Sequence, residues 1–174
     1  MQADGIVYGT GGNTFGQLGN GSKKGSLEPI KMIGLPPIKK ISCGHHSGAI
    51  SKSGDLYLWG TGIFGEYLSP RRIELYTPIK DISIGGCFGA AIDEKGVCYT
   101  WGSNTSGELG VGDYEARINP FPLLKLRNKT VMNISCGGYF AIALGPVHKF
   151  NKYTIDSAPS NGNTLNNMFL LNQH

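Results

Sequence analysis

The chain contains 174 residues, of which 40% are hydrophobic and 16% are charged, and it includes 27 glycines. These values exclude an intrinsically disordered protein and indicate a globular β protein rich in turns. The net charge of +4 comes from short basic pieces such as Lys23-Lys24 and Arg71-Arg72. Because no long basic run exists, a solvated surface is favoured over a nucleic-acid-binding patch. Arg71 and Arg72 follow a proline in a divergent turn, and we take them as candidate partner-binding residues.

The first element is a glycine-rich stretch, VYGTGGNTFGQLGNG, at residues 7–21. A loop that cradles a nucleotide phosphate has a similar composition, but it needs a helix N-terminus directly after it. Here Gly25, Pro29 and Gly34 interrupt any helical run, and the Gly-Lys-Ser/Thr ending of a P-loop is missing. The sequence therefore predicts a structural turn at this place and no bound cofactor.

Two further copies of this stretch follow in the chain. They read GDLYLWGTGIFGEYL at residues 54–68 and GVCYTWGSNTSGELGVGD at residues 96–113. In the middle copy Tyr67 and Leu68 replace the Leu-Gly pair of the other two, and the turn that follows is shorter. A repeat of roughly 40–50 residues is typical of solenoids and propellers.

A second element repeats between these copies, as ISCGHHSGAI at 41–50, ISIGGCFGAAI at 82–92 and ISCGGYFAIAL at 134–144. In one unit this pattern predicts short strands at 41–44, 47–51 and 56–59. A fourth strand is expected around 27–33, 73–75 and 122–126, where nearby prolines favour an edge position. Four short strands per unit form a propeller blade, so we predict an all-β fold.

Together these motifs resemble the regulator of chromosome condensation (RCC-type) repeat over residues 4–144, with the best match at 93–113. The resemblance implies a β-propeller, commonly of seven blades. It also implies family roles in nucleotide exchange on the small GTPase Ran, chromatin docking, enzyme inhibition and scaffolding. The repeat positions that we expect to be structural are Gly11, Gly16, Gly19, Gly44, Trp59, Gly60, Gly65, Gly85, Trp101, Gly102, Gly107, Gly110 and Gly137.

We divide the chain into three repeats, at about 4–53, 54–95 and 96–144, and an Asn-rich C-terminal tail at 145–174. The expected fold is a partial β-propeller arc of about three four-stranded blades, which is too short to close a seven-bladed ring. The arc starts at the third strand of one blade and stops after the second strand of another. We therefore expect other protein chains, either copies or a different protein, to complete or cap its edges. The alternative is a self-contained arc whose tail covers one end.

The tail carries six asparagines and no repeat signature. Its apolar residues could form one turn that docks on a blade edge or on a partner, and a partly disordered end is the alternative. These candidate partner-binding residues are Leu165, Met168, Phe169 and Leu171.

The four cysteines are Cys43, Cys87, Cys98 and Cys136, without a C-x-x-C pair that would suggest zinc. Cys43 and Cys136 occupy the same repeat position on different blades, so we predict buried, reduced thiols rather than disulfides. The first residues lack the basic and apolar regions of a signal peptide, and no apolar run reaches the ~20 residues that span a membrane. These features predict a cytoplasmic location, with a cytoskeletal or nuclear assembly as further options.

No catalytic constellation appears in the sequence. His46 aligns with Phe88 and Phe140, so we predict a packed ring rather than a base or a metal ligand. Glu66 and Glu108 are equivalent positions on different blades and form no catalytic pair. We therefore expect no catalytic, cofactor-binding or metal-binding residues and no enzymatic activity.

The predicted function is that of a non-catalytic scaffold or interaction subunit of a larger assembly. The alternatives are a guanine-nucleotide exchange factor or regulator of a small GTPase, and a chromatin-associated propeller. Exchange activity would need a complete propeller face, of which three blades supply less than half.

Overall fold

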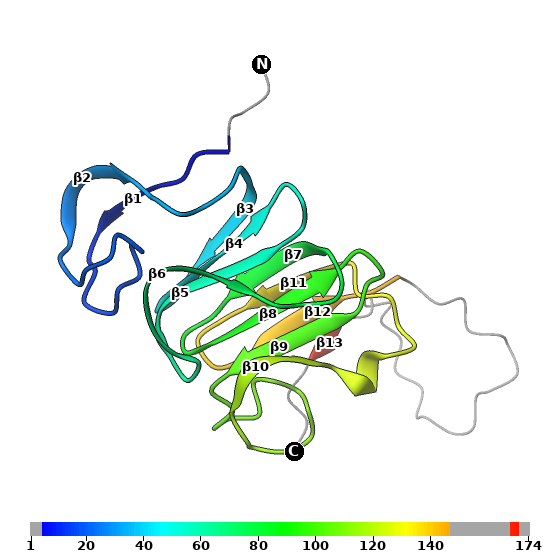
Figure 1. The fold of residues 1–174 in the computed structure, drawn as a ribbon. Helices are drawn as coiled ribbons and strands as arrows, with labels where there is room; N and C mark the ends of the chain where they lie inside the picture. Colours follow the sequence, from blue (N-terminus) through cyan, green and yellow to red (C-terminus); the bar gives the residue numbers. More distant parts are fainter. Residues whose placement is uncertain (1–4, 147–167, 171–174) are drawn as a thin grey trace, which may run out of the picture.

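The computed structural model describes residues 5–146 and the strand at Met168–Leu170, and there the chain forms antiparallel β-sheets and one 3₁₀ turn (Figure 1). One complete blade contains β3 (Ile38–Cys43), β4 (His46–Ser51), β5 (Leu56–Gly62) and β6 (Gly65–Ile73), which pair in that order. The next complete blade contains β7 (Ile79–Ile84), β8 (Phe88–Asp93), β9 (Cys98–Gly102) and β10 (Arg117–Pro122). These sheets confirm the predicted all-β propeller arc.

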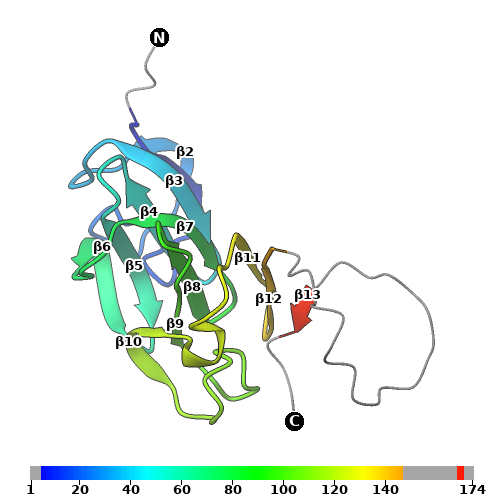
Figure 2. The same cartoon turned by 90° about the vertical axis from the view of Figure 1, so that its right-hand side faces the viewer.

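A partial blade flanks each side of this pair. β1 (Tyr8–Gly11) and β2 (Ser26–Lys31) form a two-stranded sheet before it. β11 (Asn133–Cys136), β12 (Ala141–Leu144) and β13 (Met168–Leu170) form a three-stranded sheet after it (Figure 2). The expected three four-stranded blades are thus two complete blades between two partial ones.

Two of the expected fourth strands lie elsewhere. β6 starts at Gly65, because the short middle turn is a tight hairpin in which Gly62 pairs with Gly65, and it ends at Ile73. β10 ends at Pro122, and a 3₁₀ turn (η1) covers Leu124–Leu126 in place of the strand expected at 122–126. Pro122 has no amide to continue the ladder.

The core lies between neighbouring blades. Every residue of β4 and of β8 is buried, because each of these second strands has sheet neighbours on both sides and another blade against its face. The largest cluster of buried residues joins the two complete blades and includes Ile50, Leu58, Ile82 and Trp101. A second cluster joins β8 and β9 to β11 and β12.

Glycines at the inner turns set the distance between blades. A Cβ on Gly86 would lie 2.7 Å from the carbonyl oxygen of Gly138, and one on Gly85 would lie 2.5 Å from that of Gly137. A Cβ on Gly44 would overlap the carbonyl oxygen of Gly85. Side chains at these positions would push the blades apart, since Cβ atoms do not approach backbone oxygens within 3.0 Å.

The repeated serine of the Ile-Ser element connects each blade to the next. Ser42 Oγ accepts a hydrogen bond from the backbone N–H of Ile84 at 2.9 Å, and Ser83 Oγ accepts one from Cys136 at 2.9 Å. The residue two places before the serine is Lys40, Asp81 or Asn133 in successive blades. Lys40 forms an ion pair with Asp81, and the second oxygen of Asp81 accepts a hydrogen bond from Asn133 at 3.5 Å. This one repeat position therefore also joins three successive blades.

Candidate functional site

In the glycine-rich loop at 12–25, amide groups form hydrogen bonds to other groups of the same loop, so the loop is not built as a phosphate cradle. Asn13 is 2% exposed, and its Nδ2 donates to the carbonyl oxygens of Ser22 and Lys24 while its Oδ1 accepts from the N–H of Leu18. The N–H of Phe15 donates to Gln17 Oε1. Because these donors already have partners within the loop, they are not presented to an anion.

Asn104 repeats this arrangement in the later copy. Its Nδ2 donates to the carbonyl oxygens of Asp113 and Glu115, and its Oδ1 accepts from the N–H of Leu109 at 3.0 Å. The asparagine of the repeat is therefore the organiser of the long loop. The middle copy has no such loop, because Gly62 and Gly65 close it as a hairpin.

Because the middle copy has a hairpin in place of the long loop, the buried indole N–H of Trp101 lacks an acceptor among the described residues. Trp59 Nε1 donates to the carbonyl oxygen of Gln17 at 2.8 Å, and Ser47 Oγ donates to the same oxygen at 2.8 Å. Trp101 holds the equivalent position and is 0% exposed, yet within the described residues its Nε1 has no partner. The long loop of the preceding blade supplies the acceptor for Trp59, and the short hairpin supplies none for Trp101.

His46 is a packed ring, as its alignment with Phe88 predicted. It is 0% exposed and lies edge-on to Phe64, with ring centroids 4.9 Å apart. Burial, with a smaller contribution from His45, lowers the pKa of His46 from 6.5 to about 4. Neither ring nitrogen has a partner among the described residues, so this histidine is neutral at physiological pH and is not positioned as a base.

An exposed row of side chains lies at the inner turns. His45, Cys87 and Tyr139 each stand one residue before the ring position of their blade, and all three are exposed. His45 Nδ1 lies 3.5 Å from Cys87 Sγ, and the His45 ring stacks on Phe15 with centroids 6.1 Å apart. Tyr139 is 67% exposed and Phe15 is 47% exposed. We call these four residues the inner-turn row.

The thiols differ from the prediction that all four are buried. All four cysteines are free, but Cys43 and Cys87 are exposed. Burial raises the pKa of Cys98 and that of Cys136 to about 12. Cys87 is exposed because its blade places it at the outward position of the inner turn, one residue before the buried Phe88.

The candidate pair Arg71 and Arg72 lies on β6, the outermost strand of its blade. Arg72 donates from Nε and Nη2 to Asp55 Oδ1 at 2.9 and 2.6 Å, which raises the pKa of Arg72. Arg71 lies over the ring of Tyr67, 4.7 Å from its centroid, and donates to its hydroxyl. Both guanidinium groups therefore have partners within the blade.

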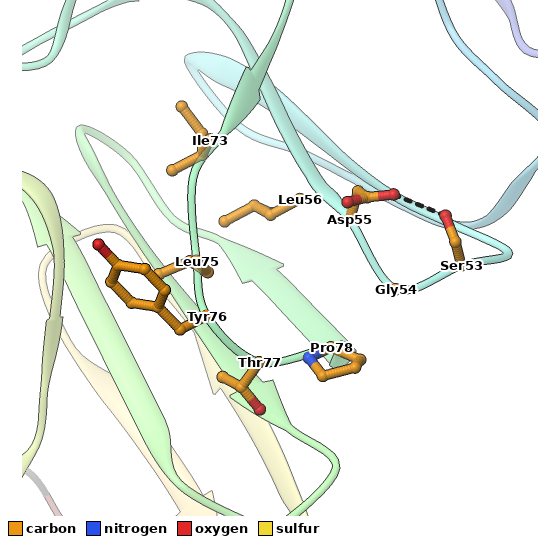
Figure 3. Close-up of a pocket in the computed structure, with 9 residues that line it drawn as sticks. All are labelled: Ser53, Gly54, Asp55, Leu56, Ile73, Leu75, Tyr76, Thr77 and Pro78. Carbon is orange, nitrogen blue, oxygen red and sulfur yellow. Dashed lines mark hydrogen bonds between the residues drawn. The ribbon is translucent and has the colours of Figure 1, made fainter.

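A small pocket of about 180 Å³ lies at the opposite ends of the strands, beside the Gly54 turn (Figure 3). Its apolar part comes from Leu56, Ile73 and Leu75. The Asp55 carboxylate accepts hydrogen bonds from Ser53 and Arg72, and these bonds lower its pKa. The pocket is therefore a small recess of mixed polar and apolar lining, and its charged group already pairs with Arg72.

The described part of the chain holds no group of three or more His, Cys, Asp or Glu side chains that could bind a metal. It also holds no helix long and apolar enough to cross a membrane. In the tail, Met168 and Phe169 lie in β13, which pairs with β12, rather than in the apolar turn that we expected. Leu165 and Leu171 lie outside the described residues.

Sequence reasoning missed two sets of organising residues. These are the inter-blade serines Ser42 and Ser83, and the loop asparagines Asn13 and Asn104. Their recurrence in register was the available signal, because each serine makes the same bond to the next blade and each asparagine makes the same bond within its own loop.

Comparison with known proteins agrees with this architecture. The family model described as the regulator of chromosome condensation (RCC1) repeat matches residues 4–50 and 95–144, and a second RCC1 repeat model matches residues 79–108. The chain is 32% identical to the RCC1 domain-containing protein RUG3, mitochondrial, of Arabidopsis thaliana over 82% of this chain and 36% of that protein. It is 33% identical to the ultraviolet-B receptor UVR8 of the same plant over 81% of this chain and 35% of that protein.

Human E3 ubiquitin-protein ligase HERC2 is 31% identical over 80% of this chain, which spans 3% of that protein. The solved structure of human WBSCR16 superposes with a TM-score of 0.74 at 22% identity, over 83% of this chain and 41% of that one. Prp20p of Saccharomyces cerevisiae superposes with a TM-score of 0.69 at 22% identity, over 80% of this chain and 39% of that one. The chain thus spans about a third of RUG3 and of UVR8, and it belongs to the RCC1 repeat family.

Proposed function

We propose that this chain is a non-catalytic interaction subunit that binds a partner protein through the inner-turn row. The observation that carries the proposal is the contact between His45, Cys87 and Phe15, which come from two inner turns and a long loop. Beneath them, the bonds of Ser42 and Ser83 and the close approach at Gly85 and Gly86 fix the spacing of the blades. The row can therefore present a rigid surface whose side chains differ from blade to blade.

The chemistry of the row suits a protein partner. Tyr139 and Phe15 expose large rings that lose little rotamer entropy on binding, as is typical of interface hot spots. Several basic side chains of the arc are engaged in ion pairs on different blades, such as Lys23–Glu66 at 2.7 Å and Arg117–Asp113 at 2.7 Å. A contiguous cationic surface of the kind that binds phosphates is not formed by these pairs.

Affinity purification of the tagged chain from its own cells, followed by quantitative mass spectrometry, tests the proposal. Tyr139→Ala should lose a defined partner, whereas Tyr76→Ala should retain it. Tyr76 is a matched control because it is 110% exposed and lies in the linker at the opposite end of the blade. A partner lost equally in both variants, or retained in both, would contradict the proposal.

The exchange-factor alternative has its own assay. Prp20p, whose structure was described together with its binding to Gsp1p and histones, shares this fold at 22% identity. If the chain instead regulates a small GTPase, it should accelerate the release of fluorescent GDP from Ran. We expect the release rate to stay at its unassisted value. A partner seated on Arg71 and Arg72 would appear as loss of binding in Arg71→Ala with Tyr139→Ala unaffected.

A further inference from the structure

β13 gives the last sheet a third strand that comes from the C-terminal tail. It pairs antiparallel with β12, with Ala143 opposite Phe169 and Leu144 opposite Met168. Figures 1 and 2 both show β13, in red, beside β12. In the complete blades this place belongs to β5 and to β9, which follow their second strands after short turns.

The register of β13 equals the register of those third strands. The repeated alanine of the second strand lies opposite an aromatic residue in each of the three sheets that contain such a strand: Ala49 opposite Tyr57, Ala91 opposite Tyr99, and Ala143 opposite Phe169. One step away, an apolar residue lies opposite another apolar residue: Ile50 opposite Leu56, Ile92 opposite Cys98, and Leu144 opposite Met168. A one-residue slip would break both matches, because it would exchange the two faces of the strand.

We propose that the edge of β12 that faces away from β11 is a strand-acceptor site for an extended apolar–aromatic–apolar segment, and that Met168–Leu170 of the same chain is its occupant. The main-chain ladder would supply affinity, and the position opposite Ala143 would supply selectivity for an aromatic residue. In this arrangement the tail completes the third strand of the last blade and covers an edge that would otherwise pair with other chains.

An occupant in the same chain has a concentration advantage over a second copy. A covalent connection gives the tethered strand an effective concentration on the order of 1 mM. A strand of another molecule present at about 10 µM would therefore need roughly 100-fold higher intrinsic affinity to displace it. β1 of a second copy is the natural competitor, since Tyr8 aligns with Tyr99 in the repeat.

Disulfide trapping in the full chain tests the occupant and the register together. Leu144 and Met168 are direct partners, so Leu144→Cys with Met168→Cys should form a disulfide under mild oxidation. The slipped pair Leu144→Cys with Phe169→Cys is the matched control, because neighbouring residues of a strand point to opposite faces. Both pairs are placed in a background in which the exposed Cys43 and Cys87 are serine.

A mixture of ¹⁵N-labelled and unlabelled protein separates the possible occupants. Peptide mapping should show the 144–168 disulfide within single chains, at least tenfold more abundant than the 144–169 disulfide. Mixed-isotope disulfides would show that a second copy fills the site and would overturn the proposal. Equal yields for the two pairs, or no disulfide in either, would overturn it as well.

Amide exchange provides a readout that needs no cysteine. Phe169→Asp should raise the exchange rates of the β12 amides at least tenfold and leave those of β4 and β8 unchanged. Asn166→Asp adds the same charge to the tail at a residue other than Met168–Leu170 and should leave the exchange rates of all three strands unchanged. Unchanged β12 exchange in Phe169→Asp would show that β13 does not pair there.

Discussion

A matched pair of glycines offers the sharpest test of blade packing. Gly86 and Gly138 hold the same repeat position, but a Cβ on Gly86 would lie 2.7 Å from the Gly138 carbonyl oxygen, whereas a Cβ on Gly138 would have no atom within 4 Å. Neither glycine has the positive φ that disfavours other residues. The substitutions Gly86→Ala and Gly138→Ala therefore differ in the neighbouring blade and not in backbone strain.

The expected cost of Gly86→Ala follows from the contacts that must yield. Restoring an ordinary contact with the blade of Gly138 requires the two blades to separate by about 0.7 Å. The hydrogen bond from Gly86 N–H to Gly137 O joins the same two blades and is already long, at 3.2 Å. Losing it costs about 1 kcal/mol, and the overpacked turn adds about 1 kcal/mol. A loss of about 2 kcal/mol lowers the melting temperature by roughly 6 °C in a chain of this size.

Gly138→Ala should act in the opposite direction. An alanine that fits without strain reduces the entropy of the unfolded chain and stabilises the fold by about 0.5 kcal/mol. Thermal unfolding followed by circular dichroism, with urea titration as a second method, measures both variants. Equal changes in the two variants, or destabilisation of Gly138→Ala alone, would refute the inter-blade distances described above.

Three further predictions concern buried and exposed side chains. The pKa of His46 is lowered from 6.5 to about 4, so its neutral form stabilises the fold above pH 6.5, and about 3 kcal/mol is lost as the pH falls towards 4. Urea titrations of His46→Phe should lack this step, and a step of equal size in the variant would count against burial of the ring. Trp59→Phe should cost about 1 kcal/mol more than Trp101→Phe, because only Trp59 Nε1 has an acceptor, and equal urea midpoints would contradict this. Ellman's reagent should titrate Cys43 and Cys87 in the native protein and the other two thiols only after unfolding, whereas four fast thiols would exclude the described packing.

The sequence predicted those parts of the fold that recur in register. The Ile-Ser element and the aromatic strand gave β3, β4 and β5 within a few residues, because their alternation and glycine boundaries repeat in each unit. The fourth strand was less accessible. Its position depends on the length of the loop before it, and the middle unit replaces that loop with the hairpin between Gly62 and Gly65.

The candidate site was harder to find because exposure is a property of the assembled blades. His45 and His46 are neighbours of identical type, yet His46 is 0% exposed while His45 faces solvent. The alignment with Phe88 identified the buried ring. It did not identify the residue before it as part of a row, since the proximity of His45 to Cys87 arises across two blades.

The arrangement separates the residues that hold the blades from those that face outward. Ser42 and Ser83 repeat one bond to the next blade, so substituting either should disturb the spacing of the arc. The side chains of His45, Cys87 and Tyr139 do not repeat one bond in this way: His45 contacts Cys87 across two blades at 3.5 Å, and each of the three positions carries a different chemistry. Surface residues can therefore change without altering the distance between blades. A surface whose side chains vary while its spacing stays fixed is what the proposed recognition of a partner protein requires.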